Sequence, residues 1–411
     1  MRNNGQGNQG RVRVMQLIAP NTLGGAERVV LSIQQWLGRG GEDGEVKRRE
    51  NGEARGNETR EEENGEYFSS TLGVFSWVKK PDNAFLREVS SRGYPHVIFP
   101  MRFAFDWANL VQLFRSLKAN RIQLLHTHGY RSDILGLICA RAARIPVVTT
   151  LHGWTAMDWK VRRYEDVQRW GLPFFSAIIA VSEEIKDRLI RQRGIDPGKI
   201  TVLQNAVSLP HEADGWAQPA DRGQIRRQFD CDPDAPVIGF VGRLSPEKNP
   251  ADLLRATSLL ARRIPNMLCW IVGEGPERSA LENQAMSLGI TQRVRFLGFQ
   301  AQISRIYKAL DVLAITSSTE GTPMALLEAM SWGIPVVSTR VGGIGALLEH
   351  GVDGFLVNPG DTAGLVRSLE RVLSDPELAH EMGKTAREKV RVEFAMAGWI
   401  QKIRKVYRRC L

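Results

Sequence analysis

Two glutamates flank a predicted helix start in the stretch TEGTPMALLEAM, where Glu320 and Glu328 lie eight positions apart. Thr322 followed by Pro323 is typical of a helix N-cap and a first helical residue. The backbone N–H groups at positions 324 and 325 would then lack helical acceptors and suit phosphate oxygens. Carboxylates accept hydrogen bonds from hydroxyl groups. The stretch therefore predicts an elongated ligand with a phosphate centre and hydroxylated ends, rather than an acid–base pair on one helix face.

Two cations follow another predicted strand, 237–241, in the segment GRLSPEKNP. Arg243 and Lys248 can bind a diphosphate, the guanidinium through two hydrogen bonds and the ammonium as a point charge. Cations in a loop are commonly solvated surface charges. Ligands of open α/β sheets, however, bind at the carboxyl ends of strands. The position of this pair therefore favours a diphosphate site.

Three histidines lie near the ends of two further predicted strands. His152 follows strand 146–151, and His126 and His128 lie at the end of strand 122–126. A neutral imidazole can hydrogen-bond a hydroxyl or phosphate beside a reacting carbon, or carry a proton. A structural role is an equal alternative for His126 and His128, whereas the functional interpretation is favoured for His152.

Glycine turns follow the first strand of the chain and a later one. Gly24 and Gly25 come after the apolar run 12–18, and Gly273 and Gly275 end strand 267–272. Glycine lets the backbone approach a ligand closely. The first pair does not form G-x-G-x-x-G, so it gives little support for a dinucleotide, and a plain tight turn is the alternative.

Strands alternate with helices along most of the chain, and this alternation starts twice. The pattern predicts an α/β fold with two doubly wound parallel sheets. The expected boundaries are a first domain over 1–208, a linker over 209–236, a second domain over 237–392 and a C-terminal helix over 393–411.

Residues 41–66 interrupt the first domain and differ sharply in composition. They hold ten acidic and five basic side chains with two apolar ones, so we expect a disordered insertion. The formal net charge of the chain is +10, which leaves +15 outside this segment. Such an excess suits anionic ligands or an anionic membrane surface. Nucleic acid is not expected as a partner, because no stacking aromatics accompany a basic groove pattern.

The composition, with 43% apolar and 24% charged residues, is that of a globular protein. No stretch reaches the roughly 18 uncharged apolar residues that span a bilayer. The polar start of the chain lacks the apolar core of a signal peptide. We therefore expect a cytoplasmic protein, with membrane contact limited to the inner face.

Metal binding is not expected. The four cysteines are scattered without a C-x-x-C pair, which is typical of small buried side chains in a reducing compartment. Asp230, Asp232 and Asp234 form a D-x-D-x-D run, but it precedes the first strand of the second half. This run therefore lies away from the carboxyl end of the sheet, where ligands bind.

Several segments resemble the retaining glycosyltransferases of family 4, which have the GT-B fold. They are GRLSPEK, VGEGP, FLGF and EGTPMALLEAMSWGIPVVST, and the last contains the E-x7-E signature of that family. LGGAER, TLHG and LQNAV fit as well, so the resemblance covers nearly the whole chain outside 41–66. It implies two Rossmann-like domains facing a cleft, a nucleoside-diphosphate sugar held mainly by the second, and no metal or other cofactor. A glycan or lipid-linked acceptor in polysaccharide or glycolipid synthesis is implied too.

The resemblance also implies roles for matching residues. Arg243 and Lys248 would stabilise the departing diphosphate, Glu320 would bind the donor sugar, Glu328 the ribose, and His152 would lie near the anomeric carbon. The implied catalytic residues are His152, Arg243, Lys248 and Glu320. The implied donor-binding residues are Gly24, Gly25, Gly273, Gly275, Gly321, Thr322, Pro323, Met324, Ala325 and Glu328. Where the family often has NGVD, this chain has NAVS from Asn205 onward.

Two alternatives from other classes stay open: a sugar-nucleotide epimerase with the GT-B fold, and a binding protein without catalysis. The C-terminal segment WIQKIRKVYRR also allows two interpretations. It places Trp399, Ile403 and Tyr407 at helical spacing with cations between them. Basic amphipathic helices bind anionic membranes, but packing of this apolar face on the first domain is the favoured interpretation.

Overall fold

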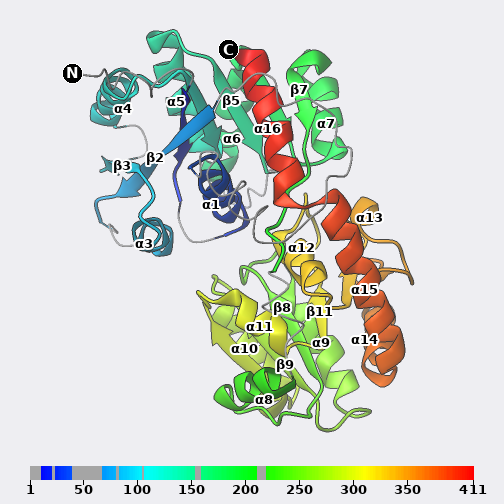
Figure 1. The fold of residues 1–411 in the computed structure, drawn as a ribbon. Coiled ribbons are helices and arrows are strands. Elements are labelled where there is room, and N and C mark those ends of the chain that lie inside the picture. Colours follow the sequence, from blue (N-terminus) through cyan, green and yellow to red (C-terminus); the bar gives the residue numbers. More distant parts are fainter. Residues whose placement is uncertain are drawn as a thin grey trace, which may run out of the picture. The chain divides into compact units, whose positions relative to one another are not determined.

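The computed structural model describes residues 11–20, 24–38, 67–79, 83–103, 106–152, 159–210 and 219–411. These residues form two compact units, whose elements are labelled in Figure 1. Unit 1 holds the described residues up to Ala180, then Lys186–Leu203 and Ile400–Leu411, and unit 2 holds Val181–Ile185 and Gln204–Trp399. The insertion predicted at 41–66 lies outside the described residues.

Unit 1 is built on a parallel sheet. Among the described strands, the order is β3-β2-β1-β4-β5-β6-β7. These strands are β1 (Arg11–Ile18), β2 (Tyr67–Trp77), β3 (His96–Met101), β4 (Leu124–His128), β5 (Val147–Leu151), β6 (Ala177–Ala180) and β7 (Ile200–Val202). All residues of β4, β5 and β6 are buried, as expected for parallel strands that helices cover on both faces.

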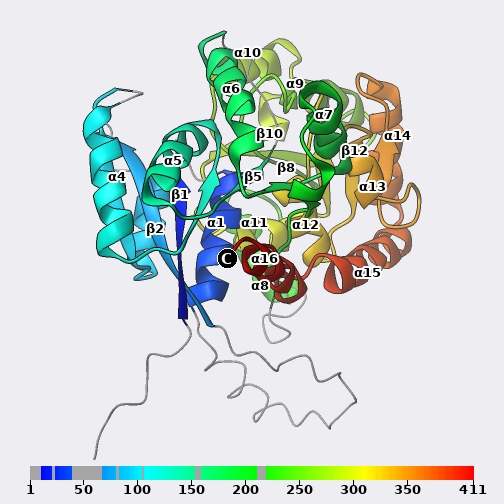
Figure 2. The same ribbon diagram turned by 90° about the horizontal axis from the view of Figure 1, so that it is seen from above.

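The helices of unit 1 cover both faces of this sheet. The chain moves from β1 outward to β2 and β3, and then it returns past β1 to β4, β5, β6 and β7. Because parallel crossovers are right-handed, the two directions place their helices on opposite faces. The first run contains α1 (Gly25–Gly38) and α3 (Ala84–Ser91); the second contains α4 (Trp107–Ala119), α5 (Tyr130–Ala143), α6 (Trp159–Gly171) and α7 (Glu183–Arg193). Figure 2 shows α4 and α1 on opposite sides of β1 and β2.

Unit 2 contains a second parallel sheet with the order β10-β9-β8-β11-β12-β13 among its described strands. These strands are β8 (Val237–Val241), β9 (Leu268–Val272), β10 (Val294–Gly298), β11 (Val312–Ile315), β12 (Val336–Thr339) and β13 (Phe355–Val357). The helices that follow them include α9 (Pro250–Leu260), α10 (Arg278–Ser287), α11 (Ile303–Ala309), α12 (Met324–Ser331), α13 (Ile344–Leu347), α14 (Thr362–Ser374) and α15 (Pro376–Glu393). The two doubly wound sheets confirm the predicted α/β class.

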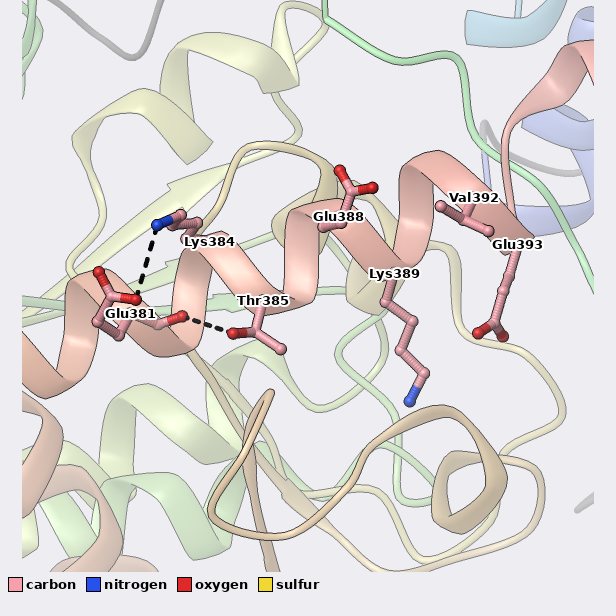
Figure 3. Close-up of a pocket in the computed structure, with 7 residues that line it drawn as sticks. All are labelled: Glu381, Lys384, Thr385, Glu388, Lys389, Val392 and Glu393. Carbon is pink, nitrogen blue, oxygen red and sulfur yellow. Dashed lines mark hydrogen bonds and ion pairs between the residues drawn. The ribbon is translucent and has the colours of Figure 1, made fainter.

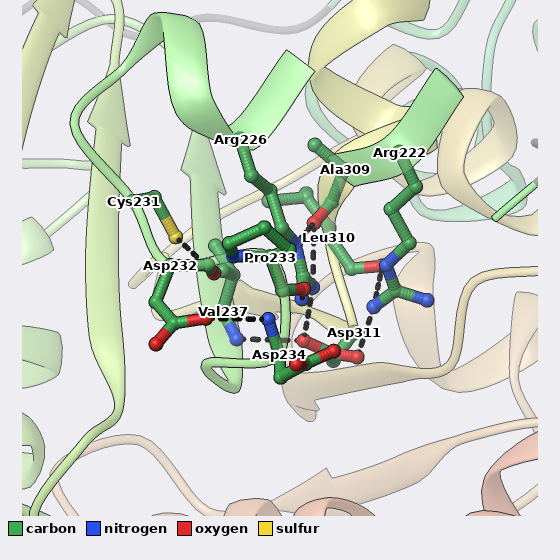
Figure 4. A network of polar contacts seen from close by, with 10 residues as sticks. All are labelled: Arg222, Arg226, Cys231, Asp232, Pro233, Asp234, Val237, Ala309, Leu310 and Asp311. Carbon is green, nitrogen blue, oxygen red and sulfur yellow. Dashed lines mark hydrogen bonds and ion pairs between the residues drawn. The ribbon is translucent and has the colours of Figure 1, made fainter. Parts of the chain in front are cut away.

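A helix lies within 209–236, the stretch for which the sequence suggested only a linker. α8 (Pro219–Gln228) is anchored in unit 2 by Arg226, whose guanidinium lies 2.6 Å from the Asp311 carboxylate (Figure 4). The same carboxylate accepts the backbone N–H of Val237 at 2.7 Å. Asp311 thus ties α8 to the first residue of β8. Local sequence pattern did not reveal this helix, because its anchor is a partner 85 positions away.

The last helix, α16 (Met396–Cys410), has a buried apolar face. Trp399, Ile403 and Tyr407 are all buried, although cations lie between them in the sequence. The ring of Tyr407 packs at 5.7 Å between centroids from that of Phe68 in β2. These apolar side chains pack inside the protein, so they are not exposed for insertion into a membrane.

Candidate functional site

An ion pair joins the loops that follow β8 and β11, which are neighbouring strands. Lys248 Nζ lies 2.6 Å from Glu320 Oε1, and the two side chains are 28% and 8% exposed. The Ser317 hydroxyl donates to the same oxygen at 2.7 Å. Within the described residues, no hydrogen bond engages Oε2 of Glu320, so this oxygen can accept one from a ligand. The structure thus brings together two residues that the sequence singled out independently.

Side-chain hydroxyls fix these two loops. Thr316 donates to the backbone carbonyl of Asn249 at 2.8 Å, and Thr339 donates to that of Ser317 at 2.6 Å. The backbone N–H of Ser318 donates to the carbonyl of Glu247 at 2.8 Å. Sequence reasoning missed these residues, as it missed Ser317, although hydroxyl residues just after β11 were a visible signal. Such ties hold the ion pair in place before any ligand binds.

Arg243 lies in the same β8 loop and is exposed. The neighbouring Leu244 N–H donates to the carbonyl of Glu274 at 3.0 Å, which fixes the loop backbone. Over the part of the chain that the structure describes, the Arg243 guanidinium forms no ion pair. A cation in this position is able to bind an anion without first releasing a carboxylate.

The helix that follows Glu320 starts one residue later than predicted. α12 begins at Met324, and Pro323 has φ −69° and ψ 124°, an extended conformation that precedes the helix. The N-cap is Pro323 and not Thr322, whose hydroxyl donates to the Val181 carbonyl at 2.7 Å. The Asn205 amide donates to the carbonyl of Thr322 at 2.8 Å. The predicted capping arrangement is therefore wrong, since one acceptor and one donor distant in sequence, which local pattern cannot show, engage this threonine.

The start of α12 still offers backbone donors. The N–H groups of Met324 and Ala325 have no acceptor among the described residues, whereas that of Leu326 donates to the Pro323 carbonyl at 3.1 Å. Free N–H groups and the helix dipole together favour an anion. These donors follow Gly321 and the Glu320 loop directly in the chain, so an anion site and a hydroxyl acceptor adjoin each other.

Glu328 lies between one and two turns further along α12. Tyr307 of α11 donates its hydroxyl to Glu328 Oε2 at 2.7 Å, and this tyrosine is buried. The hydrogen bond orients the carboxylate on the partly exposed side of the helix. Tyr307 was not identified from the sequence, because it precedes β11 and no local motif links it to Glu328.

Glycines bring the loops after β8 and β9 into direct contact. A Cβ on Gly273 would lie 1.9 Å from the Gly242 carbonyl oxygen, and one on Gly275 would lie 2.1 Å from that of Leu244. Real Cβ atoms do not approach this closely, so both positions require glycine. These predicted ligand-binding glycines thus have a packing role: they hold the loop that carries Arg243.

A second pair of glycines, after β12, was not singled out from the sequence. A Cβ on Gly342 would lie 1.8 Å from the backbone oxygen of Glu320, and one on Gly343 would lie 2.2 Å from that of Gly321. The N–H of Gly343 also donates to the Glu320 carbonyl at 3.3 Å. Inspection of every strand exit for glycine would have found this pair, because it follows the predicted strand 335–338.

The predicted site residues of unit 1 lie at its own strand ends. Gly24 precedes α1, and its N–H donates to the Glu27 carboxylate at 3.1 Å. Gly25 is the first residue of α1 and is exposed. His152 directly follows β5 and is partly exposed. These three residues therefore belong to a different unit from the Lys248–Glu320 pair.

The alternation of side chains along β4 separates two polar clusters. His126 lies on the same face as Tyr407 of α16: its Nδ1 is 2.7 Å from the tyrosine hydroxyl, and its Nε2 is 2.8 Å from the Thr150 hydroxyl. Gln16 donates to the Tyr407 hydroxyl at 2.9 Å and lies 2.8 Å from His128 Nε2. These contacts give His126 and His128 the structural role that was the alternative to a functional one.

His152 stacks beside this cluster, with 6.0 Å between its ring centroid and that of His128. Burial lowers the pKa of His126 to about 3 and that of His152 to about 4, and it holds the pKa of His128 well below its usual value. The three imidazoles are therefore neutral at neutral pH. Nε2 of His152 is buried and has no hydrogen-bond partner among the described residues.

The opposite face of β4 carries a buried carboxylate cluster. Asp133 of α5 accepts hydrogen bonds from Thr127, Gln168 and Thr149, the last at 2.8 Å. Burial raises the pKa of Asp133 to about 6, although these hydrogen bonds act in the other direction. The cluster connects α5 and α6 to two strands, which is a structural role.

Metal ligands are not clustered in the part of the chain that the structure describes, where no group of three His, Cys, Asp or Glu side chains is arranged to hold an ion. In the D-x-D-x-D run, the Asp232 carboxylate accepts the backbone N–H of Asp234 at 2.9 Å. Its geometry is that of a turn. Among the described helices, none has the length and apolarity needed to cross a membrane.

A hollow on the surface of α15 (Figure 3) is lined by Glu381, Lys384, Thr385, Glu388, Lys389, Val392 and Glu393. Glu388 pairs with Arg391 at 2.6 Å, and Lys389 pairs with Asp353 at 2.8 Å. No strand ends here, and Glu381 and Lys384 also pair with each other, at 3.8 Å. This hollow therefore has none of the features of the strand-end site.

Family models match both halves of the chain. One described as "Glycosyltransferase Family 4" matches residues 23–210, and one described as "Glycosyl transferases group 1" matches residues 221–389. The chain is 31% identical over 312 residues to UDP-Gal:alpha-D-GlcNAc-diphosphoundecaprenol alpha-1,3-galactosyltransferase of Escherichia coli, covering 74% of this chain and 79% of that protein. It is 26% identical over 348 residues to N-acetyl-alpha-D-glucosaminyl L-malate synthase of Bacillus anthracis, covering 83% and 88%.

A solved structure has a similar fold. HepE of Anabaena, in complex with UDP and glucose, matches with a TM-score of 0.79 and 24% identity, covering 97% of this chain and 99% of that one. At this identity the likeness concerns the fold alone. The matches thus extend over both units and include both loops of the ion pair.

Proposed function

The chain belongs to glycosyltransferase family 4 and has the GT-B fold, and on this premise we propose that it transfers a sugar from a nucleoside-diphosphate sugar with retention of anomeric configuration. The acceptor is a glycan or a lipid-linked sugar in polysaccharide or glycolipid synthesis. The observation that carries this proposal is the Lys248–Glu320 ion pair beside the N-terminus of α12.

The diphosphate of the donor is proposed to bind between cations and helix amides. Arg243 is exposed and has no carboxylate partner within the described residues, and Lys248 lies on the neighbouring part of the same loop. The free N–H groups at the start of α12 add donors that do not titrate. Groups fixed in this way stabilise charge that develops on a leaving group, because they need little reorganisation during the reaction.

The hydroxylated ends of the donor are proposed to bind the two glutamates. Glu320 keeps Oε2 available while Lys248 and Ser317 occupy Oε1, so one sugar hydroxyl can donate to it without breaking the ion pair. Glu328, oriented by Tyr307, is proposed to accept from the ribose. The eight positions between the glutamates then correspond to the distance from sugar to ribose.

The unit 1 residues have more limited proposed roles. Gly25 has an exposed position at the start of α1, which leaves space for phosphate oxygens, and Gly24 shapes the turn before it. His152 is neutral because burial lowers its pKa to about 4, and its Nε2 is unpaired among the described residues. We propose that it hydrogen-bonds the donor sugar near the anomeric carbon.

The proposed reaction proceeds on one face of the sugar. The bond between the anomeric carbon and the diphosphate oxygen breaks, which leaves an oxocarbenium-like sugar. The acceptor oxygen forms its bond to that carbon on the same face, and its proton passes to the departing phosphate oxygen. Arg243 and Lys248 neutralise the leaving diphosphate, so the proposal requires neither a metal ion nor a cofactor.

A lipid-linked acceptor is supported by the similar Escherichia coli enzyme, whose name specifies a diphosphoundecaprenol-linked sugar. We propose that this chain works in the cytoplasm at the inner face of the membrane. Nothing in the comparisons or the geometry supports the epimerase alternative.

The proposed function is tested by heating the purified protein with uridine, guanosine and adenosine diphosphate sugars. A donor that binds only the native state raises the melting temperature. We expect one class of donor to do so, and we expect Lys248→Ala to reduce the shift, because Arg243 and the helix amides still bind the diphosphate. Lys384→Ala, which removes an exposed lysine of α15, serves as the matched control. A chain that no donor stabilises, or a Lys248→Ala variant with the full shift, contradicts the proposed site.

A further inference from the structure

Large apolar side chains are exposed on adjoining elements of the outer layer of unit 1. Trp107, Trp170 and Phe174 are 77%, 71% and 58% exposed. They belong to α4, to α6 and to the short 3-10 turn Leu172–Phe174 that follows α6. Ile138 of α5 and Val111 of α4 are exposed as well. In unit 2, by contrast, the exposed large apolar residues occur singly, one to each element, as in Met286 of α10 and Val392 of α15.

These residues lie on adjoining helices of one layer. α4, α5 and α6 all follow the second run of crossovers, and α5 contacts both neighbours. The Cys139 thiol of α5 lies 3.4 Å from the Leu110 carbonyl of α4. The Arg141 guanidinium of α5 lies 6.0 Å from the ring centroid of Phe174. We call this layer surface, defined by Trp107, Val111, Ile138, Arg141, Val167, Trp170 and Phe174, the aromatic face.

The exposed apolar residues of the aromatic face are separate from those that pack in the core. On α4, Leu113 and Leu117 point inward, whereas Trp107 and Val111, one turn apart, point outward. On α5, Leu135 is buried, whereas Ile138 is exposed. α4 and α5 thus each carry apolar side chains that the sheet covers and others that stay exposed. Large exposed apolar side chains gathered on adjoining elements are a mark of an interaction site.

The charge around this face is mainly positive. Between positions 107 and 144 the chain carries six cations: Arg115, Lys118, Arg121, Arg131, Arg141 and Arg144. The one carboxylate in this range, Asp133, is 1% exposed and points to the sheet side. On α6, Asp166 is paired with Arg169 at 2.8 Å. The partner of the aromatic face must therefore combine an apolar layer with negative charge.

We propose that the aromatic face docks the enzyme on an anionic phospholipid bilayer. Trp107, Trp170 and Phe174 would lie at the level of the headgroups, where amphipathic aromatic rings are favoured. Arg115 and Arg141 would meet lipid phosphates. The inference deepens the proposed use of a lipid-linked acceptor, and it assigns membrane contact to α4, α5 and α6 instead of α16, whose apolar side is buried.

The arrangement also fits access to the acceptor. Helices of a parallel sheet run alongside the strands, so the aromatic face is parallel to them. The strand carboxyl ends of unit 1, with His152, then lie at the edge of the docked layer and are not covered by it. A lipid-linked sugar leaving the headgroup region could reach this edge.

The test is flotation of the purified chain with vesicles of phosphatidylcholine, with or without phosphatidylglycerol. Wild type binds the anionic vesicles, and salt weakens this binding. The double variant Trp107→Ser/Trp170→Ser lowers the partition coefficient about a hundredfold, roughly tenfold for each ring. Arg115→Glu/Arg141→Glu removes the preference for anionic lipid. Met286→Ser/Val392→Ser removes equally exposed apolar groups from unit 2 and retains wild-type binding.

Each variant is checked for an unchanged melting temperature and an unchanged stabilisation by donor, which separates failure of the docking surface from failure of the proposed function. The proposal is overturned if wild type does not bind anionic vesicles, or if the tryptophan variant binds as well as wild type. It is equally overturned if sedimentation shows a dimer that the tryptophan variant dissociates while vesicle binding persists, because the face would then be an interface between copies of the chain.

Discussion

Replacing Lys248 by alanine separates its proposed chemical role from its contribution to the fold. If its ammonium stabilises the departing diphosphate, its removal costs about 3–4 kcal/mol in the transition state, or about 10²–10³ in kcat. The donor still has Arg243 and the helix amides, so KM changes less than kcat. Radiolabelled donor and a purified acceptor give both constants.

The expected loss of stability is much smaller. Glu320, which is 8% exposed, loses the ammonium at 2.6 Å but keeps the hydrogen bond from Ser317. Because Lys248 is 28% exposed and water screens the pair, we expect about 1–2 kcal/mol. For a unit of this size, such a loss lowers the melting temperature by roughly 2–4 °C per kcal/mol. The variant is therefore folded at assay temperature, and its activity can be interpreted.

A double-mutant comparison tests whether lost stability explains the lost activity. Lys248→Ala combined with Glu320→Gln removes both charges, so most of the stability lost through the unpaired carboxylate returns. The chemical interpretation predicts that activity does not return with it. Recovery of kcat to near the wild-type value in the double variant would show that the lysine acts only through its ion pair.

Other expected outcomes concern the cluster under α16 and the loop of Glu320. Tyr407→Phe lowers the free energy of unfolding in urea by about 1–3 kcal/mol, because the buried side chains of Gln16 and His126 each lose their hydrogen bond to the tyrosine hydroxyl. Gly342→Ala lowers kcat about tenfold or more, because its Cβ would lie 1.8 Å from a carbonyl of the active loop; Gly398→Ala, with no atom within 4 Å, retains activity. Burial lowers the folded pKa of His126 to about 3, so the unfolded chain binds more protons and this contribution to stability is lost as pH falls from about 6.5 toward 3. Asp133, with a pKa raised to about 6, acts in the opposite direction between about pH 4 and 6. Because His126→Gln removes the histidine titration, its free energy of unfolding in urea should fall less between pH 7 and pH 5 than that of wild type.

The fold class was accessible from the sequence because strands and helices alternate with clear apolar runs. The loops at the ends of β8 and β11 were accessible too, since the carboxyl ends of parallel strands converge at one edge. The 2.6 Å contact between Lys248 and Glu320 satisfies this expectation, although the two residues are 72 positions apart.

Contacts between residues far apart in the sequence could not be predicted from the sequence. Thr322 and Pro323 have the local chemistry of a helix start, yet a carbonyl 141 positions away takes the threonine hydroxyl. Tyr407 meets His126 across 281 positions, so neither residue revealed this contact. Competition among distant partners, rather than local propensity, decided these arrangements.

Proton NMR during transfer from the donor that stabilises the protein shows the anomeric configuration of the product. We expect a product with the same configuration as the donor sugar, formed by wild type and by Lys384→Ala but not by Glu320→Ala. An inverted product, an epimerised free donor, or transfer by Glu320→Ala at the wild-type rate would contradict this expectation.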